Sequence, residues 1–351
     1  MPEYRNAVRD PDLAAAVTRR IPMVYDEGPS RDDDRPPHVR AASGLSLFKE
    51  YLAVIQDDAN WLALIDADDR VHAIPLPASP SGARVFSRHR GNRHEKFDLE
   101  ACVTVPGPSA HELIGFGSGS HEGREWILRI HEGASFGAVL AEDAVQERIG
   151  IHLRAEFIAA RRFYDSLRAN GDFSGVRLNI EGAVALDDDR IMLFQRGNAR
   201  SSEDGDAVNA TAELSWRELA AHLRDPARVP PPELRRVTCY ELGTLDGVRL
   251  TFSDAELISP DGRILFSASA EDPHTDRIAG SVLGIIEPDG AARWGEVLDQ
   301  DGQPFGGKIE GLTRDLRDRR RVRFVIDDDD ESVPSEIFEA LLSDAFGATS
   351  R

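Results

Sequence analysis

Cysteine is scarce in this sequence: Cys102 and Cys239 are the two in a chain of 351 residues, and they lie far apart. A disulfide framework and a cysteine-based zinc site both need several cysteines at close spacing, so both are excluded. We expect instead two small, buried side chains in a reducing compartment.

Long apolar runs are absent as well. No stretch approaches the ~18 uninterrupted apolar residues that a membrane helix needs. The N-terminal residues Met1–Arg5 do not lead into the apolar segment and small-residue cleavage site of a secretion signal. We therefore expect a cytoplasmic protein that does not associate with a membrane.

Basic residues are outnumbered, with 42 Lys and Arg against 62 Asp and Glu, for a formal net charge of −20. A nucleic-acid binder needs a basic face to neutralise phosphates, so the composition argues against nucleic acid as a partner. Anionic lipid is disfavoured for the same reason. A metal cation or a cationic ligand suits this charge better.

The sequence does contain a repeated pattern of short segments with the alternation typical of β-strands. Each unit opens with a polar or acidic residue, then Gly or Ala, then an apolar strand. The opening residues are Ser43, Glu100, Glu181, Asp254 and Glu310, at spacings of 57, 81, 73 and 56 residues. This favours an all-β protein, a five-bladed β-propeller in which each blade packs on its neighbours. The alternative is an α+β protein whose similar openings are coincidence.

The boundaries of this single domain, residues 1–351, follow from the repeats. Blades are expected at 42–77, 98–140, 179–242, 252–299 and 308–343, and the N-terminal segment 15–40 is expected to close the ring on the last blade. A helical insertion, 141–170, would separate blades two and three, because apolar residues recur at roughly helical spacing over Asp143–Leu167. A helix within blade three is expected over Trp216–Arg224, with Ser215 as N-cap and Asp225-Pro226 as the stop.

The innermost strand of a propeller blade lines the central channel, so the five opening residues would converge on one axis. Four carboxylates there would repel one another and shift their pKa values upward unless a cation lay between them. A set of oxygen ligands suits Ca²⁺ better than zinc. The alternative is that these acids bind backbone N–H groups and water at the starts of strands.

Cationic residues are expected on the same face. The segment Arg88–Lys96 is basic within an acidic protein, and Arg40, Arg177 and Lys308 precede inner strands. Cations beside a metal would suit an anionic ligand bridged to it. The alternative for Arg88–Lys96 is a solvated loop that balances the surrounding acids.

The motifs resemble the calcium-activated nucleotidases (apyrases), five-bladed propellers with one Ca²⁺ in the central channel. In that family Ser, Glu, Glu, Ser and Glu surround the metal. The resemblance places these roles on Ser43 in ASGL, Glu100 in DLEA, Glu181 in NIEGA, Asp254 in FSDA and Glu310 in KIEGL. The family's acidic pair matches Asp57-Asp58, its second acidic segment Glu271-Asp272, and its arginine-bearing loop Gln195–Asn198. The similarity runs over residues 40–345 as short motifs, and Asp254 departs from it because the family has serine there. The chain looks closer still to uncharacterised bacterial propellers with DLEA, NIEGA and QRGN motifs.

The resemblance implies a Ca²⁺-dependent hydrolase of a phosphate-containing or other anionic small molecule. Asp57 or Asp58 would act as general base, and Arg196, Arg93 and Lys96 would stabilise negative charge. The further substrate-binding candidates are His94, Asn198 and Glu271. Two alternatives stay open, a metal-dependent lactonase or esterase and a non-catalytic scaffold with structural Ca²⁺. The sequence predicts no oligomeric state.

Overall fold

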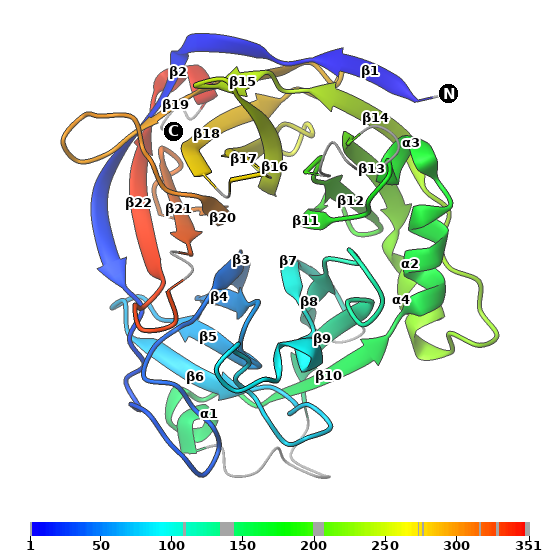
Figure 1. The fold of residues 1–351 in the computed structure, drawn as a ribbon, viewed down its shortest axis with the longest axis vertical. Coiled ribbons are helices and arrows are strands. Elements are labelled where there is room, and N and C mark those ends of the chain that lie inside the picture. The colour runs from blue at the N-terminus through cyan, green and yellow to red at the C-terminus, as the bar shows by residue number, and fades with distance from the viewer. Residues whose placement is uncertain are drawn as a thin grey trace.

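The computed structural model describes residues 2–107, 110–133, 144–198, 207–272, 274–275, 277–315, 317–327 and 330–347. Strands dominate, and they form mainly antiparallel sheets arranged around a common centre (Figure 1). The expectation of a mainly β protein is confirmed.

Three of the sheets are separate. The first contains β3 (Ala42–Phe48), β4 (Tyr51–Gln56), β5 (Trp61–Ile65) and β6 (Val71–Pro75). The second contains β7 (Leu99–Pro106), β8 (His111–Gly117), β9 (Trp126–Glu132) and β10 (Leu153–Ala159). The third contains β11 (Ile180–Ala185), β12 (Arg190–Gln195), β13 (Asn209–Ser215), β14 (Arg235–Glu241) and β1 (Glu3–Asn6).

A nine-stranded sheet completes the structure, and the long N-terminal strand β2 (Val8–Pro22) joins its two halves. One half contains β15 (Thr244–Leu245), β16 (Val248–Leu257), β17 (Ile264–Asp272), β18 (Arg277–Ile286) and β19 (Ala292–Leu298). The other contains β20 (Ile309–Arg314), β21 (Arg321–Ile326) and β22 (Glu336–Leu342). Strand β2 pairs in parallel with β19 and antiparallel with β22, so the N-terminal segment provides an outer strand to both halves.

The three separate sheets and the two halves of the nine-stranded sheet are called the five groups of strands, numbered in chain order. Their inner strands, β3, β7, β11, β16 and β20, face the centre (Figure 1). Strand β3 contacts β7, β7 contacts β11, β11 contacts β16, β16 contacts β20, and β20 contacts β3 again. The inner strands therefore form a closed ring. Because each inner strand is antiparallel to the next strand of its group, the starts of the inner strands and the ends of β4, β8, β12, β17 and β21 lie at one end of this ring.

Apolar side chains fill the space between neighbouring groups of strands. Each of five buried clusters combines residues of two adjacent groups, for example Leu113 and Leu128 with Leu62 and Leu64. The other clusters join the second group to the third, the third to the fourth, the fourth to the fifth, and the fifth to the first. Cys102 and Cys239 are buried and unpaired, as expected.

The helices are short: α1 (Ala144–Ile149), α2 (Arg161–Arg168), α3 (Gly171–Ser174) and α4 (Trp216–Arg224), with the 3₁₀ helices η1 (Arg93–Glu95) and η2 (Asp344–Phe346). The predicted helix α4 is confirmed, since Ser215 accepts a hydrogen bond from the Glu218 N–H and Asp225 follows its last turn. No helix in the described ranges is long and apolar enough to cross a membrane.

The prediction of one helix over Asp143–Leu167 is wrong in its middle, while Asp143 itself lies outside the described residues. Leu153–Ala159 forms β10, the outer strand paired with β9. Apolar residues four apart, such as Leu153 and Phe157, fit both a helix face and a strand face. Here Leu153, Ala155 and Phe157 pack on one side of β10, and Gly150 at φ +71° follows the end of α1.

The close approach of β2 to β19 gives a test of the fold. A Cβ atom on Gly295 would lie 1.7 Å from the Leu13 carbonyl oxygen. We expect Gly295→Ala to separate β2 from β19 and to lower the free energy of unfolding by about 3 kcal/mol. Gly306 is the control, because a Cβ there would meet no atom within 4 Å. Urea unfolding followed by tryptophan fluorescence measures both variants, and equal stability would contradict this packing.

Candidate functional site

Each inner strand contains a β-bulge, which lies near the start of β3, β7, β11 and β20 and in the middle of β16. The pairing register shifts between Ala42 and Gly44, Leu99 and Ala101, Ile180 and Gly182, Phe252 and Asp254, and Ile309 and Gly311. A bulge leaves one extra residue outside the ladder and redirects its side chain. These extra residues, called the bulge residues below, are Ser43, Glu100, Glu181, Ser253 and Glu310.

Asp254 is thus not the equivalent of the other four predicted ring residues, which corrects the sequence analysis. It occupies the position of Gly44 or Gly182, and its Oδ2 accepts a hydrogen bond from the Leu312 N–H at 2.7 Å. Burial raises the pKa of Asp254 well above its ordinary value. The residue that the sequence analysis missed is Ser253, because the position of the bulge follows only from the pairing of β16 with β17. The order of the bulge residues is then Ser, Glu, Glu, Ser, Glu.

Ser43 and Ser253 are both buried at this end of the ring. Ser43 Oγ donates to the Leu99 carbonyl oxygen at 2.6 Å, which links β3 to β7. Ser253 Oγ lies 2.9 Å from the Ser267 Oγ of the neighbouring strand β17.

Lys96 lies among three carboxylates, and we call this group the Lys96 cluster. Oxygens of Asp57, Asp98 and Glu100 lie within 4.8 Å of one another. Lys96 forms an ion pair with Asp57, and its Nζ is 2.9 Å from Asp98 Oδ1. Lys96 is only 6% exposed, so it is an internal counter-ion and not part of a solvated basic loop.

The environment separates the pKa values of these acids. Burial and the Asp98 charge raise the pKa of Asp57 to about 8. Burial also acts on Asp98, but the Lys96 and Arg124 cations outweigh it and lower its pKa to about 2. Burial and the nearby Asp57 and Glu181 charges raise the pKa of Glu100 well above its ordinary value. Among the described residues, Asp57 Oδ1 is buried without a hydrogen-bond partner. The Lys96 charge opposes the rise in the pKa of Glu100 but does not outweigh it.

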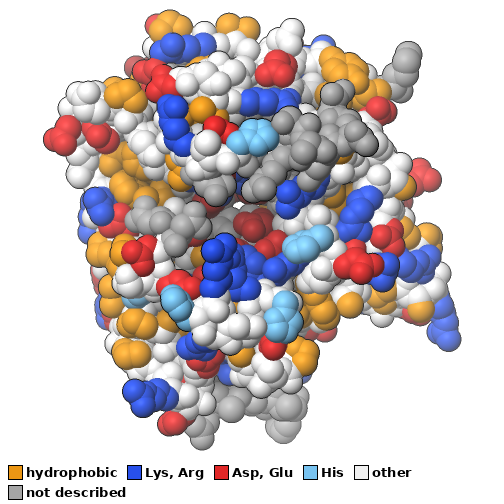
Figure 2. Space-filling view, viewed as in Figure 1, with side chains coloured by type: hydrophobic (Ala, Val, Ile, Leu, Met, Phe, Trp, Pro, Cys, Tyr) orange, Lys and Arg blue, Asp and Glu red, His pale blue; other side chains and the backbone are white. Residues whose placement is uncertain are grey.

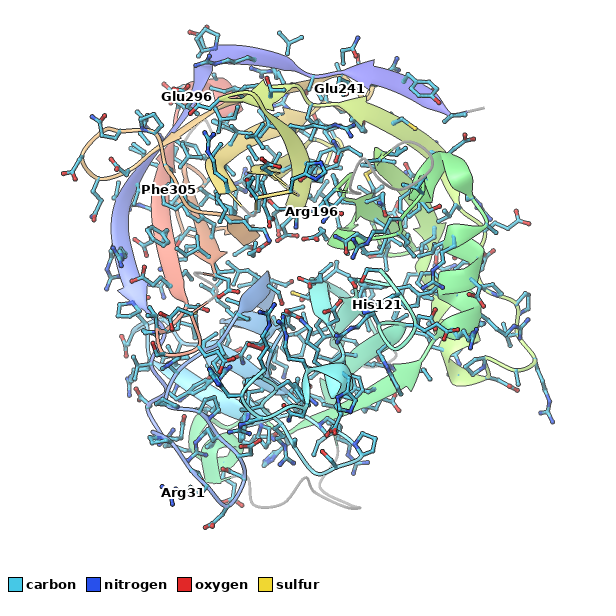
Figure 3. The ribbon with its side chains drawn as sticks, viewed as in Figure 1. Arg31, His121, Arg196, Glu241, Glu296 and Phe305 are labelled. Atoms are coloured by element: carbon cyan, nitrogen blue, oxygen red, sulfur yellow. The ribbon has the colours of Figure 1, made fainter. Side chains whose placement is uncertain are left out.

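A second group, the Arg196 cluster, combines residues from the third, fourth and fifth groups of strands. It consists of Glu181, Arg196, Glu271, Lys308 and Glu310. Arg196 Nη1 is 3.1 Å from Glu181 Oε1, its Nη2 pairs with Glu271, and its Nε donates to Thr251 Oγ1 at 3.2 Å. Figure 3 shows Arg196 near the centre of the ring.

Lys308 completes the Arg196 cluster, with its Nζ 2.6 Å from Glu310 Oε1 and 3.3 Å from Glu271 Oε2. Burial acts on Glu271, but the Lys308 and Arg196 cations outweigh it and lower its pKa to about 2. Burial raises the pKa of Glu310 to about 7, although the Lys308 charge opposes this. The cluster is therefore an internal network of opposite charges.

The other predicted site residues divide between the site and the surface. Asn198 lies beside the Arg196 cluster, because Asn179 Nδ2 is 2.6 Å from Glu181 Oε1 and 3.4 Å from Asn198 Oδ1. Asp58 instead pairs with Arg40 at 3.3 Å. Arg93 and His94 are exposed on η1, with the His94 side chain 75% exposed. Of Arg93, His94 and Lys96, Lys96 alone is inside the site, together with the predicted Arg196.

The centre of the ring is hollowed at the face shown in Figure 2, with acidic side chains inside the hollow and Lys, Arg and His side chains around it. A separate cavity of about 790 Å³ lies between the third and fourth groups of strands, where Glu213, Tyr240 and Glu287 are among its lining residues. It contains none of the predicted site residues. The hollow is therefore the candidate functional site, because acidic side chains and basic side chains lie next to one another there.

Residues 38–342 match the family described as "Family of unknown function (DUF6929)", and the chain belongs to that family. Strands β1 and β2 precede the matched range. No curated protein matches the chain.

Solved structures share low identity with the chain. A protein of unknown function from Bacteroides thetaiotaomicron is 10% identical, with a TM-score of 0.41; the alignment covers 90% of this chain but 59% of that protein. A gluconolactonase from Xanthomonas campestris is 11% identical (TM-score 0.35; coverage 86% and 72%). A virginiamycin B lyase from Staphylococcus aureus is 10% identical (TM-score 0.37; coverage 92% and 98%). At these TM-scores the similarities carry no argument about activity.

The burial of Arg196 generates a stability prediction. Arg196→Met would leave Glu181 and Glu271 without their guanidinium partner, so we expect the free energy of unfolding to fall by about 3 kcal/mol. Arg190 is the control: it begins β12, which ends directly before Arg196, and its partner Asp187 is exposed, while its other partner Glu213 keeps a pair with Arg236. Arg190→Met should change stability by about 1 kcal/mol or less. Urea unfolding of both variants checks the difference, and a larger loss for Arg190→Met would contradict it.

Glu271 generates a pH prediction. Its pKa is about 2 in the folded protein and ordinarily 4.5, so its ionised form contributes stability that is present above pH 4.5 and lost as the pH falls toward 2. We expect Glu271→Gln to lower the free energy of unfolding by about 2 kcal/mol at pH 7. The difference from wild type should shrink between pH 4.5 and 2. A difference independent of pH over that range would refute the ionic role.

Proposed function

We propose that this chain is a five-bladed β-propeller that binds Ca²⁺ at the bulge residues and hydrolyses a phosphate-containing or other anionic small molecule. The observation that carries the proposal is the placement of five bulge residues, three of them glutamates, at one end of one closed ring of inner strands. Five groups of strands with a shared bulge are typical of repeated blades. We infer a cytoplasmic protein from the sequence composition alone.

The donor set fits a hard cation. Glu100, Glu181 and Glu310 offer carboxylate oxygens, Ser43 and Ser253 offer hydroxyls, and no nitrogen or sulfur ligand stands among the bulge residues, as Ca²⁺ prefers. The buried, unpartnered Oδ1 of Asp57 supports a cation on the Glu100 side. The raised pKa of Glu100 has the same physical origin, since it is a buried carboxyl facing other acids.

We assign Asp57 to cation binding and not to the role of general base. Its Oδ2 pairs with Lys96, and one of its carboxylate oxygens lies within 4.8 Å of oxygens of Asp98 and Glu100. Asp58 pairs with Arg40 and is not a member of the Lys96 cluster. A bound Ca²⁺ would polarise a phosphoryl or carbonyl oxygen of the ligand. Lys96, Arg196 and Lys308 limit the repulsion among the buried acids, so that an anion can approach.

A non-catalytic scaffold is the second candidate, and one observation favours it. The charged groups also connect neighbouring inner strands, since Arg196 bonds to Thr251 in β16 and to Glu271 in β17. A metal there would stabilise the ring even without a reaction. A lactonase would need an apolar pocket beside the insertion. The apolar side chains of α2, Phe163, Tyr164 and Leu167, are fully buried. A cavity of about 730 Å³ does lie beside α2 and α3, with Ser166, Asn170 and Leu234 among its lining residues.

Calcium binding is tested by titration calorimetry on metal-free protein. We expect Ca²⁺ to bind wild-type protein, and Glu100→Gln to weaken binding about 10-fold or more. Glu132→Gln is the control. Glu132 is exposed and is the last residue of β9, so it lies at the end of the ring away from the bulge residues. Unchanged binding by Glu100→Gln would refute the site.

The reaction class is tested by screening nucleotides, phosphoesters and lactones for turnover that EDTA abolishes. Turnover of phosphate compounds supports the hydrolase, and turnover of lactones alone supports the lactonase. Ca²⁺ binding that raises the melting temperature without any turnover would identify the scaffold.

A further inference from the structure

One face of the fourth group of strands changes from apolar to hydroxyl side chains toward the end of the ring that carries the bulge residues. This face packs against the fifth group, and Leu265 on β17 and Leu283 on β18 belong to the buried cluster between the two groups. Because side chains alternate along a strand, Ser267 and Ser269 continue the face on β17, and Ser281 continues it on β18. All three serines are at most 2% exposed. Hydroxyls buried in this way need hydrogen-bond partners.

Ser267 occupies a position that is apolar in the other four groups. It pairs with Asp254, the residue directly after the bulge residue Ser253. The residues that pair with the equivalent position in the other groups are Ile55, Phe116, Phe194 and Val325. The hydroxyl is therefore a feature of the fourth group and not of the repeated fold.

Four buried hydroxyls link the bulge residue of β16 to the strands β17 and β18. Ser253 Oγ is 2.9 Å from Ser267 Oγ and 3.4 Å from Ser269 Oγ. Ser269 Oγ is in turn 2.8 Å from Ser281 Oγ. We call these four residues the serine network.

The serine network also holds the start of β20. Ser281 Oγ donates to the Gly307 carbonyl oxygen at 2.9 Å and accepts from the Ile309 N–H at 3.0 Å. Ile309 directly precedes the bulge residue Glu310, so these bonds fix the backbone that carries Glu310. One network thus connects the bulge residues of the fourth and fifth groups.

The number of protons determines which way the hydroxyls point, because each hydroxyl has one proton and two lone pairs. Ser281 gives its proton to a carbonyl oxygen, so its short contact with Ser269 uses the Ser269 proton, and none is left for the longer contact with Ser253. Ser267 Oγ, at 2.9 Å, accepts the Ser253 proton, and Ser267 Oγ donates its own proton to the Asp254 carbonyl oxygen at 3.4 Å. Both lone pairs of Ser253 Oγ are then without a donor among the described residues.

The other bulge serine has the same arrangement. Ser43 Oγ donates its proton to the Leu99 carbonyl oxygen at 2.6 Å, which leaves its lone pairs for another partner. Ser267 Oγ therefore has the same role for Ser253 that a backbone carbonyl has for Ser43. A hydroxyl oxygen binds a cation through its lone pairs, so both serines present the side that a metal ligand needs.

We propose that Ser267 positions Ser253 as a calcium ligand by accepting its proton, and that Ser269 and Ser281 position Glu310 through the backbone of β20. This rests on the proposed function and adds residues that do not touch the cation. Without an acceptor at position 267, the Ser253 hydroxyl is free to rotate and to turn its proton toward the cation. Hydrogen bonds that orient a ligand in this way raise the affinity for the metal.

The role of Ser267 is tested by titration calorimetry with Ca²⁺ on metal-free protein. We expect Ser267→Ala to weaken Ca²⁺ binding by about 10-fold. Ser267→Thr keeps the hydroxyl at a position where the fifth group has the β-branched Val325, and it should bind Ca²⁺ as wild type does. Ser46→Ala is the matched control, since it removes a buried hydroxyl of β3 whose partner is Thr104, and it should leave the affinity unchanged.

A double-mutant cycle distinguishes positioning of Ser253 from a general loosening of the fold. Ser267→Ala should not change Ca²⁺ affinity further when Ser253→Ala is already present, because it acts through Ser253. An equal loss in both backgrounds, or unchanged affinity in Ser267→Ala, overturns this role and leaves the calcium site standing. Absence of Ca²⁺ binding by the wild-type protein overturns the proposed site and this role together.

Discussion

The organisation of this molecule depends on the burial of like charges at one end of a closed ring of strands. Each β-bulge turns one side chain out of the ladder, and three of the five bulge residues are glutamates. Burying carboxylates together is costly unless cations accompany them. Lys96, Arg196 and Lys308 supply those cations from within the chain. Burial raises the pKa values of Glu100 and Glu310, and the charge of Glu181 raises both further.

Much of this arrangement could be predicted from the sequence, because repeated strand openings imply a shared place in each unit. The strands, the helix α4 and the meeting of Glu100, Glu181, Glu310, Arg196 and Glu271 at one end follow from that repetition. What the pattern left undetermined was register. A bulge shifts the pairing by one residue, so Ser253 and Asp254 were equally good candidates until the pairing of β16 with β17 was known.

Tertiary packing explains the other places where the structure differs from the predictions made from the sequence. Leu153–Ala159 completes the edge of the second sheet, and the backbone bonds with β9 outweigh a pattern that also suits a helix. In the basic segment, Lys96 is drawn inward by Asp57 and Asp98 while Arg93 and His94 stay exposed. The composition of a loop does not show which of its basic side chains is buried and which are exposed. The hydrogen-bond partner of Ser253 likewise depends on pairing, because Ser267 lies opposite Asp254 only in the register that the bulge of β16 produces.

The central claim is that this charged ring end binds a divalent cation, and it is tested most directly by anomalous scattering from crystals soaked in Ca²⁺. The account predicts one anomalous peak at the hollow, bounded by the carboxylates of Glu100, Glu181 and Glu310. A map with no peak at saturating Ca²⁺, in which Lys96 and Lys308 keep their ion pairs, would contradict it.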